Sequence, residues 1–170
     1  MFESGAYVAR HVDPVVEGQV QPNGVDLTLG GVTVQRTPGR IARDGKTIGE
    51  RERVEPVAPD GASGRAADAG ADAGAPVYRL EPGGYVLEYG ERIAIPDDHV
   101  GFVLPRSSLM RNSCMLNTAV WDAGYEGRGE GLLQVHHQIE IEAGARVAQL
   151  VLATAEHDGT YDGTYQGERL

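Results

Sequence analysis

One short segment that follows an apolar run brings together residue types that can bind phosphate. It carries two serines, Ser107 and Ser108, between Arg106 and Arg111. Serine is a favourable N-cap, so the segment predicts a short helix whose first backbone N–H groups are free. Such amides, together with hydroxyls and nearby guanidinium groups, can hold phosphate oxygens. A plain serine-capped turn with two surface arginines would have the same sequence, so the segment by itself leaves both interpretations open.

A second candidate for chemistry is the carboxylate of Asp122. It follows the apolar pair Val120-Trp121 and precedes the turn Ala123–Gly127, which contains two glycines. Glycines let the backbone approach a ligand closely, and a carboxylate beside them could accept a hydrogen bond from a sugar hydroxyl or act as general base on water. Aspartate is equally typical of an ordinary turn that binds no ligand.

Other catalytic sites find little support in the sequence. His136 and His137 are neighbours in a run expected to be a strand, so their rings would point to opposite faces and could not share a metal ion. The single cysteine, Cys114, is expected to be a small buried residue, and it cannot form a disulfide within the chain. The sequence contains neither a Walker motif nor the His-x-Glu and Pro-Cys-x-x-Cys pair of zinc-dependent deaminases. We therefore expect no cysteine-rich zinc site and no ATPase or kinase activity.

Short apolar runs separated by turn residues must position these groups. The runs that resemble strands are Gly24–Leu29, Tyr85–Tyr89, Arg92–Ile95, His99–Leu104, Leu132–Ile141 and Arg146–Ala153. Most are bounded by Gly, Pro or Asp, which favours an all-β fold: a β-sandwich, a jelly roll or a distorted barrel. Gly90-Glu91 predicts a hairpin over Tyr85–Ile95. Short helical turns are expected at Tyr7–His11 and Ser107–Arg111.

Length and composition predict one globular domain over residues 1–170. Charged residues make up 24% and hydrophobic residues 41%, and no apolar run approaches the length of a membrane span. The N-terminus lacks the apolar core of a secretion signal, so we expect a cytoplasmic protein without membrane contact. Val57–Pro76 consists mostly of Ala, Gly and Asp. We expect a flexible insertion there, because the segment cannot bury enough apolar surface to offset its ordering entropy.

The chain is strongly acidic, with a formal net charge of -10. Binding to a nucleic-acid polymer requires basic surface that displaces counterions, so we expect no DNA or RNA partner. The basic residues are almost all arginine, and Lys46 is the single lysine. This composition fits a salt-adapted, halophilic cytoplasm, where net charge keeps a protein in solution. A high-GC genome would produce the same arginine bias. A nucleoside triphosphate would have to be held by local cations against an unfavourable overall field.

Taken together, the motifs resemble the core of the dCTP deaminase and dUTPase superfamily. The matching pieces, in order, are Gln21–Gly30, Arg106–Arg111, Thr118-Ala119, Asp122–Gly127, Gly144–Leu150 and Tyr161–Gly167. They span nearly the whole chain apart from the Ala/Gly-rich insertion. Several motifs in the same order are far more specific than any one of them.

The resemblance implies a homotrimer built on the distorted β-barrel or jelly roll of the dUTPase-like fold, with active sites between subunits. It implies dUTP as substrate, with Mg²⁺ bound through the nucleotide phosphates. By position, the Arg106–Arg111 segment would hold the phosphates through Arg106, Ser107, Ser108 and Arg111, and Asp122 would contact the deoxyribose and activate water. The other positions implied to bind substrate are Thr118, Ala119, Leu132, Leu133 and Gln134 around the pyrimidine, and Tyr161 and Gln166 in a closing tail.

Two reactions occur on this scaffold, and residue 134 separates them. The deaminases of the family place a glutamate in the strand after the aspartate turn, where it shuttles protons while water replaces the C4 amino group. An alignment with two residues inserted after Gly127 places Gln134 there, and an amide cannot act as a carboxylate base. Glu130 is a nearby carboxylate, but it stands between glycines outside the apolar run.

The resemblance therefore favours hydrolysis of dUTP to dUMP and pyrophosphate, with Asp122 as the general base on water. One alternative is dCTP deamination, alone or combined with hydrolysis. A second is a nucleotide-binding member of the fold without catalysis. A third is a β-barrel binding module without a nucleotide ligand, which would leave the ordered motif matches unexplained.

Overall fold

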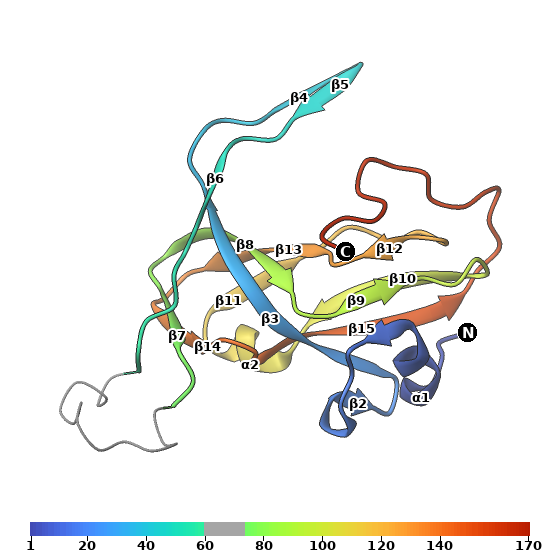
Figure 1. The fold of residues 1–170 in the computed structure, drawn as a ribbon, viewed down its shortest axis with the longest axis horizontal. Helices are drawn as coiled ribbons and strands as arrows, with labels where there is room; N and C mark the ends of the chain where they lie inside the picture. Colours follow the sequence, from blue (N-terminus) through green and yellow to red (C-terminus); the bar gives the residue numbers. More distant parts are fainter. Residues whose placement is uncertain (60–73) are drawn as a thin grey trace.

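The computed structural model describes residues 1–59 and 74–170, which form many short strands and a few helical turns (Figure 1). The helical turns are α1 Gly5–Val8, η1 Ala9–His11, η2 Glu17–Gln19 and α2 Ser107–Arg111. The strands are β1 Val12–Asp13, β2 Val20–Gln21, β3 Gly24–Gln35, β4 Arg40–Ala42, β5 Gly45–Thr47, β6 Arg51–Arg53, β7 Val77–Leu80, β8 Gly83–Tyr89, β9 Arg92–Ala94, β10 His99–Pro105, β11 Cys114–Asn117, β12 Glu126–Gly127, β13 Glu130–Val135, β14 Ile139–Glu142 and β15 Arg146–Thr154. None of the helices among these residues is long and apolar enough to cross a membrane.

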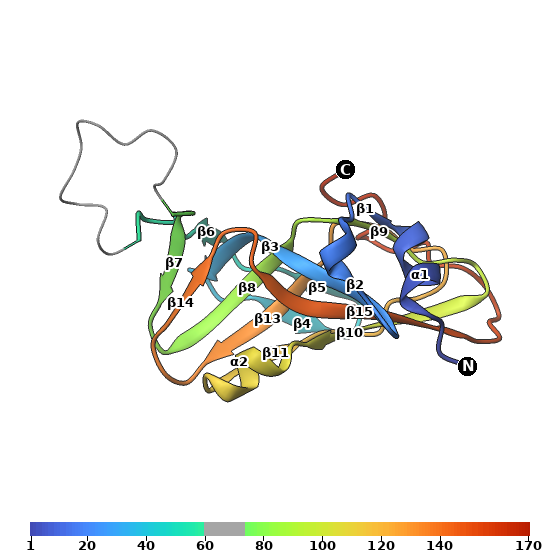
Figure 2. The ribbon, with the colours of Figure 1, turned by 90° about the horizontal axis from the view of Figure 1, so that it is seen from below.

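An eight-stranded sheet forms the body of the molecule. Its order is β10-β15-β3-β8-β13-β11, with β2 and β6 paired on β3. The long strand β3 ties the sheet together, because its first part pairs with β15 and its second part with β8. Helix α2 joins the two outermost strands, β10 and β11, along the lower side of the molecule in Figure 2. The sheet thereby approaches a closed barrel, which confirms the expected mainly β, barrel-like fold.

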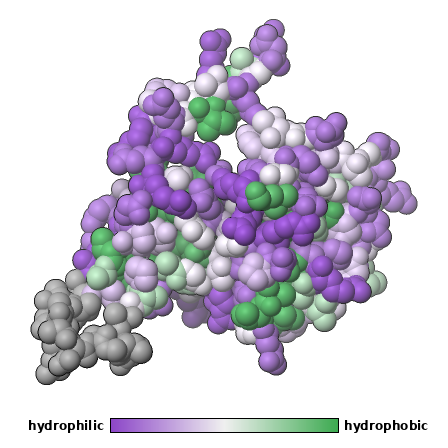
Figure 3. All heavy atoms as spheres, viewed as in Figure 1, coloured by the Kyte–Doolittle hydropathy of each residue, from purple (hydrophilic) through white to green (hydrophobic). Residues whose placement is uncertain are grey.

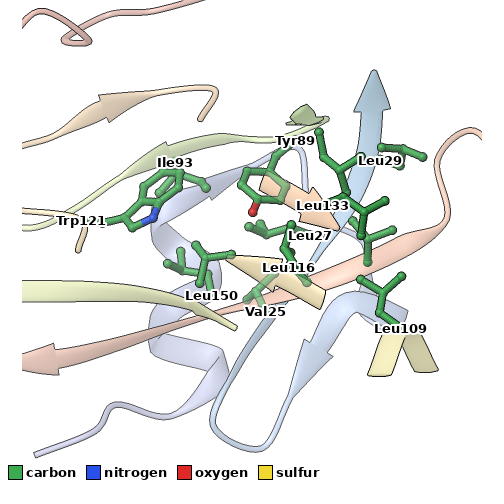
Figure 4. Close-up of a cluster of buried hydrophobic side chains, with 14 of the residues drawn as sticks. Val25, Leu27, Leu29, Tyr89, Ile93, Leu109, Leu116, Trp121, Leu133 and Leu150 are labelled. Atoms are coloured by element: carbon green, nitrogen blue, oxygen red, sulfur yellow. The ribbon is translucent and has the colours of Figure 1, made fainter. Parts of the chain in front are cut away.

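The core lies on the inner face of this curled sheet (Figure 4). Strand alternation places it there: on β13, Leu133 and Val135 are buried, while Leu132 and Gln134 face outward. Cys114 is buried at the start of β11, as expected, and burial raises the pKa of its thiol. The face of the molecule seen in Figure 3 is mostly hydrophilic, with hydrophobic residues gathered in small groups.

The expected hairpin over Tyr85–Ile95 is wrong. Strand β8 pairs with β3 and β13, whereas β9 pairs with β1 and β12 in a separate three-stranded sheet. The buried carboxylate of Glu91 fixes this change of sheet. It accepts hydrogen bonds from the backbone N–H and hydroxyl of Thr28, at 2.9 and 2.7 Å, and from the side-chain amide of Gln19 at 2.8 Å. Contacts between residues so distant in sequence leave no trace in the local pattern.

The run Leu132–Ile141 forms two strands rather than one. Strand β13 ends at Val135, and β14 begins at Ile139 and leaves the main sheet to pair with β7. His136 and His137 lie exposed in the turn between them, so the expectation that they occupy opposite faces of a strand is also wrong.

Two further expectations concern segments outside the main sheet. The helical turn expected at Tyr7–His11 is confirmed; it begins earlier, at Gly5, where the Ser4 side chain caps α1. Most of the expected insertion, residues 60–73, lies outside the described residues. The described residues on its two sides are joined, since the backbones of Val57 and Val77 exchange two hydrogen bonds of 2.8 Å.

We expect the buried carboxylate of Glu91 to hold the change of sheet in place. Glu91→Ala should lower the free energy of unfolding by about 1–3 kcal/mol for each buried donor that loses its acceptor. Glu91→Gln keeps an acceptor oxygen in the same shape and should lose less. Urea unfolding followed by the fluorescence of Trp121 measures both variants. An alanine variant as stable as wild type would contradict this role.

Candidate active site

Asp122 lies at a pocket formed by its own turn and the C-terminal tail, residues 155–170. The pocket walls include four aromatic rings and three carboxylates: Trp121, Tyr125, Tyr161, Tyr165, Asp122, Glu130 and Glu168. Ala119 also lines the pocket. The structure therefore brings together three of the residues implied by sequence, namely Asp122, Ala119 and Tyr161. A pocket with several aromatic walls and a few polar groups has the composition of a small-molecule site.

The Trp121 ring organises this pocket. The backbone of Trp121 exchanges hydrogen bonds of 2.8 and 3.1 Å with Gly101 on β10, which fixes its position. Its indole packs so closely on Gly129 that any side chain there would displace it. The ring of Tyr125 meets the indole edge-on, with centroids 5.1 Å apart, and Tyr161 packs in turn on Tyr125 at 5.6 Å. Close packing therefore fixes the positions of these aromatic rings.

The Asp122 side chain is exposed and is not used to build its own turn. Within the described ranges its carboxylate makes no hydrogen bond or ion pair, and only its backbone carbonyl accepts from the Tyr125 N–H at 3.2 Å. The turn is made by Gly124, whose φ of +78° lies in the left-handed region that favours glycine. The carboxylate is therefore available to a ligand or a water molecule.

The tail is fastened onto this turn by polar side chains. Gln166 donates to the carbonyl of Gly124 at 3.0 Å and accepts from the N–H of Glu126 at 3.2 Å. Glu168 accepts a hydrogen bond of 2.8 Å from the Tyr125 hydroxyl. Burial, followed by this bond to Glu168, raises the pKa of Tyr125, so the hydroxyl remains a donor. The amide of Gln166, implied by sequence to bind substrate, is engaged with the backbone here.

Glu130 is the one pocket carboxylate that is neutralised by two arginines. It accepts two hydrogen bonds of 2.8 Å from one nitrogen of Arg51, on β6, and it also pairs with Arg169 in the tail. These contacts join the tail to the main sheet beside the pocket. They also occupy the carboxylate that the sequence offered as the alternative to Gln134.

The implied phosphate-binding residues lie together on and beside α2. The N-cap is Arg106 rather than a serine, and no side chain caps the helix, so the expected serine N-cap is wrong. The chain is still extended at Arg106, and Ser107 is already the first helical residue. Ser107, Ser108 and Arg111 are exposed. Their side chains can therefore reach a ligand from solvent.

Arg106 is held by a buried carboxylate. Its Nε lies 3.4 Å from the Oδ2 of Asp26, which is 1% exposed. Arg146 pairs with the same oxygen at 3.3 Å, and the amide of Gln149 donates to the other oxygen at 3.3 Å. These contacts fix the direction of the Arg106 side chain from one side and leave it partly exposed on the other.

One chain does not bring Asp122 to the α2 residues. Trp121, next to Asp122, pairs with Gly101, and Arg106 follows five residues later along an extended strand. At about 3.3 Å per residue the separation is roughly 16 Å along β10. In Figure 4, Trp121 and the α2 residue Leu109 lie at opposite ends of the buried cluster. The two halves of the expected site are therefore apart.

The remaining implied residues have different surroundings. The Thr118 hydroxyl donates to the carbonyl of Val103 on β10 at 3.0 Å, so this side chain fixes the backbone next to Ala119. Gln134 lies on the outer face of β13, where its side-chain oxygen accepts from Asn117 at 3.2 Å, and Leu132 is exposed on the same face.

Leu133 differs from its two neighbours on β13. Its side chain is fully buried in the core, because alternation along β13 turns it away from Leu132 and Gln134. A ligand could therefore reach Leu133 only through its backbone. Gln134 itself is not among the residues that line the Asp122 pocket.

The sequence analysis named neither Tyr165 nor Glu168 as a substrate-binding residue. Tyr165 lies in the tail motif Tyr161–Gly167 and Glu168 follows it directly, so this motif was the available signal. Their function depends on contacts across the whole domain: the bond from Tyr125 to Glu168 joins residues 43 positions apart. Such a pairing cannot be inferred from spacing.

Comparison with known proteins places this arrangement in a family. A family model described as dCTP deaminase-like matches residues 4–155. A probable deoxyuridine 5'-triphosphate nucleotidohydrolase of Halobacterium salinarum is 59% identical over 169 residues, covering 99% of this chain and 96% of that protein. One from Aeropyrum pernix is 40% identical over 157 residues, covering 90% and 88%.

A solved structure supports the fold. The 2'-deoxycytidine 5'-triphosphate deaminase of Agrobacterium tumefaciens superposes with a TM-score of 0.62 at 17% identity. The match covers 91% of this chain and 48% of that one, so this chain spans about half the length of that deaminase. From the matched family model and the relatives that align along nearly its whole length, the chain belongs to the dCTP deaminase-like family.

Proposed function

We propose that this chain hydrolyses dUTP to dUMP and pyrophosphate. The observation that carries the proposal is the free carboxylate of Asp122 in an aromatic-walled pocket. The chain that holds it is 59% identical to a probable deoxyuridine 5'-triphosphate nucleotidohydrolase along almost its entire length.

In the proposed reaction, Asp122 accepts a proton from a water molecule whose oxygen attacks the α-phosphorus. The bond between the α-phosphorus and the oxygen that bridges to the β-phosphorus breaks, and pyrophosphate leaves with the bonding electrons. Arginines on the phosphates stabilise the charge that builds up on the leaving group. Mg²⁺ would be held through the phosphates of the nucleotide rather than by a protein ligand, and it would supply positive charge to the leaving pyrophosphate. In the part of the chain that the structure describes, no group of three His, Cys, Asp or Glu side chains could hold a metal ion.

The proposed site forms between copies of the chain in a homotrimer. The separation of Asp122 from Arg106 along β10 supports this proposal. The Asp122 pocket of one chain would hold the nucleoside, and the phosphate-binding residues on α2 of that chain are too distant to complete the same site. In the assembly, α2 of a second copy would bring Arg106, Ser107, Ser108 and Arg111 to the triphosphate. The proposed setting is a salt-adapted cytoplasm, which the net charge of -10 supports.

Deamination of dCTP is the second candidate, and the position of Glu130 at the pocket favours it. A deaminase needs a carboxylate that exchanges protons with the base. Both carboxylate oxygens of Glu130 accept hydrogen bonds from Arg51, and Glu130 also pairs with Arg169, so its oxygens are already engaged. Gln134, aligned with the deaminase glutamate, is an amide. Hydrolysis therefore remains the proposed reaction.

Asp122→Asn should abolish turnover while nucleotide binding persists. The amide keeps the shape of the side chain but cannot take a proton from water, so kcat should fall by about 100-fold or more. Pyrophosphate release from dUTP measures turnover, and calorimetry with a non-hydrolysable dUTP analogue measures binding. Asp162→Asn, an exposed carboxylate in the tail, is the matched control and should retain activity. Unchanged kcat in Asp122→Asn would remove this residue as the base.

A mixture of two inactive variants should regain activity if the site lies between copies. Asp122→Asn and Arg106→Ala each disable one half, and a mixed trimer contains sites with both intact halves. Random mixing in a closed trimer should restore roughly a quarter of wild-type pyrophosphate release, because each site draws its two halves from different subunits. The variants are unfolded together, refolded and assayed, with each variant refolded alone as control. No recovery in a refolded, trimeric mixture would place both residues in one subunit's site.

Residue 134 should control whether cytosine is processed. Gln134→Glu introduces a carboxylate where the deaminase alignment requires one, and we expect ammonia release from dCTP to become measurable. Gln134→Leu removes the amide without adding a carboxylate and should release none. If Gln134→Glu gains neither ammonia release nor dCTP binding, the alignment at this position is incorrect.

A further inference from the structure

The Asp122 pocket lacks a cation for an anionic ligand. Its lining contains Asp122, Glu130 and Glu168 but no lysine or arginine. A triphosphate that enters beside three carboxylates would be repelled unless positive charges approach from the rim. Cations that contact lining residues of this pocket are therefore candidates for a role in binding.

Two of these cations already form ion pairs with carboxylates of the pocket wall. Arg51 and Arg169 both pair with Glu130, and Arg169 also reaches Glu168 at 3.2 Å. Their charges balance the carboxylates of the pocket wall. Lys46 is different: its ammonium lies 4.2 Å from the ring centroid of Tyr165, and no carboxylate pairs with it in the described ranges. Tyr165 is itself a wall of the pocket.

Lys46 is carried by a projecting hairpin, here called the β4–β5 arm, residues 36–50. Strands β4 and β5 pair only with each other, and the arm extends from the end of β3 away from the body in Figure 1. Figure 3 shows an open space between the arm and the body. A two-stranded hairpin is marginally stable in water by itself, so the contact of Lys46 with the tail contributes to the position of the arm.

The arm is also net basic, although the chain as a whole is acidic. It contains Arg36, Arg40, Arg43 and Lys46 against Asp44 and Glu50, which is four positive and two negative charges, whereas the whole chain has a net charge of -10. Lys46 is the member of this set that contacts a pocket residue. The arm thus brings positive charge to Tyr165, a wall of a pocket that is also lined by three carboxylates.

We propose that Lys46 is a substrate-binding residue, delivered by the β4–β5 arm, whose ammonium pairs with the phosphate chain of the bound nucleotide. This proposal rests on the proposed function and adds a residue to its site. An ammonium over an exposed aromatic ring is weakly held. A charge-assisted hydrogen bond to a phosphate oxygen is stronger, so a phosphate near Tyr165 would draw the ammonium from the ring.

Calorimetric binding of a non-hydrolysable dUTP analogue and of deoxyuridine, which lacks phosphates, tests the proposal. Lys46→Ala should weaken binding of the analogue by about tenfold, the loss expected for one charged hydrogen bond, and leave deoxyuridine binding unchanged. Lys46→Arg should recover most of the affinity. Arg43→Ala, on the same arm but outside the pocket lining, is the matched control and should bind as wild type does.

Three results would overturn the proposal. Unchanged affinity of Lys46→Ala for the analogue would remove Lys46 from the site. An equal loss for the analogue and for deoxyuridine would mean that Lys46 only supports the tail. An equal loss in Arg43→Ala would mean that the charge of the arm matters and not this residue. Failure of the proposed function is distinguishable, since a wild-type protein that binds the analogue but releases no pyrophosphate from dUTP would contradict hydrolysis alone.

Discussion

The antiparallel pairing of β10 with β15 is the constraint on which the rest of the site depends. It is continuous from His99 to Pro105 and keeps β10 extended over its whole length. Because Trp121 pairs with Gly101 near one end of this strand and α2 begins just beyond the other, the two groups of proposed site residues lie apart within one chain. A rigid strand therefore turns a sequence that looks like one continuous site into two half-sites, which is the physical reason to propose an assembly.

The charged side chains around the pocket are also fixed in position by specific partners. Most arginines near the pocket are balanced by carboxylates, as Arg51 and Arg169 are by Glu130. Beside α2, buried Asp26 orients Arg106 without covering it. A protein with a net charge of -10 can bind a triphosphate only if such cations are placed individually, since the overall field opposes binding. High salt would screen that field while leaving close contacts largely intact.

Much of the framework could be predicted from the sequence, because strand alternation and turn residues are local signals. The strands expected around His99–Leu104 and Arg146–Ala153 correspond to β10 and β15, and the short helix at Ser107–Arg111 is present. The failures have one cause. The hairpin over Tyr85–Ile95 is broken by the long-range bonds of Glu91, and β14 leaves the main sheet for a partner far along the chain.

The candidate site could also be predicted only in its local part. The motif identified Asp122, but its partners in the pocket depend on the tail folding back across the domain, as with Tyr165 and Glu168. Alternation along β13 decides which of its side chains can meet a ligand, and it turns the side chain of Leu133 into the core. The arm that carries Lys46 has few apolar residues and gave no strand signal at all.

The most direct test of the central claim is a product assay of the wild-type protein with Mg²⁺ and either dUTP or dCTP, at low and at molar salt. Pyrophosphate and ammonia are measured separately. The account predicts pyrophosphate from dUTP in one-to-one ratio with dUMP and no ammonia from dCTP. Ammonia from dCTP without pyrophosphate from dUTP would contradict it.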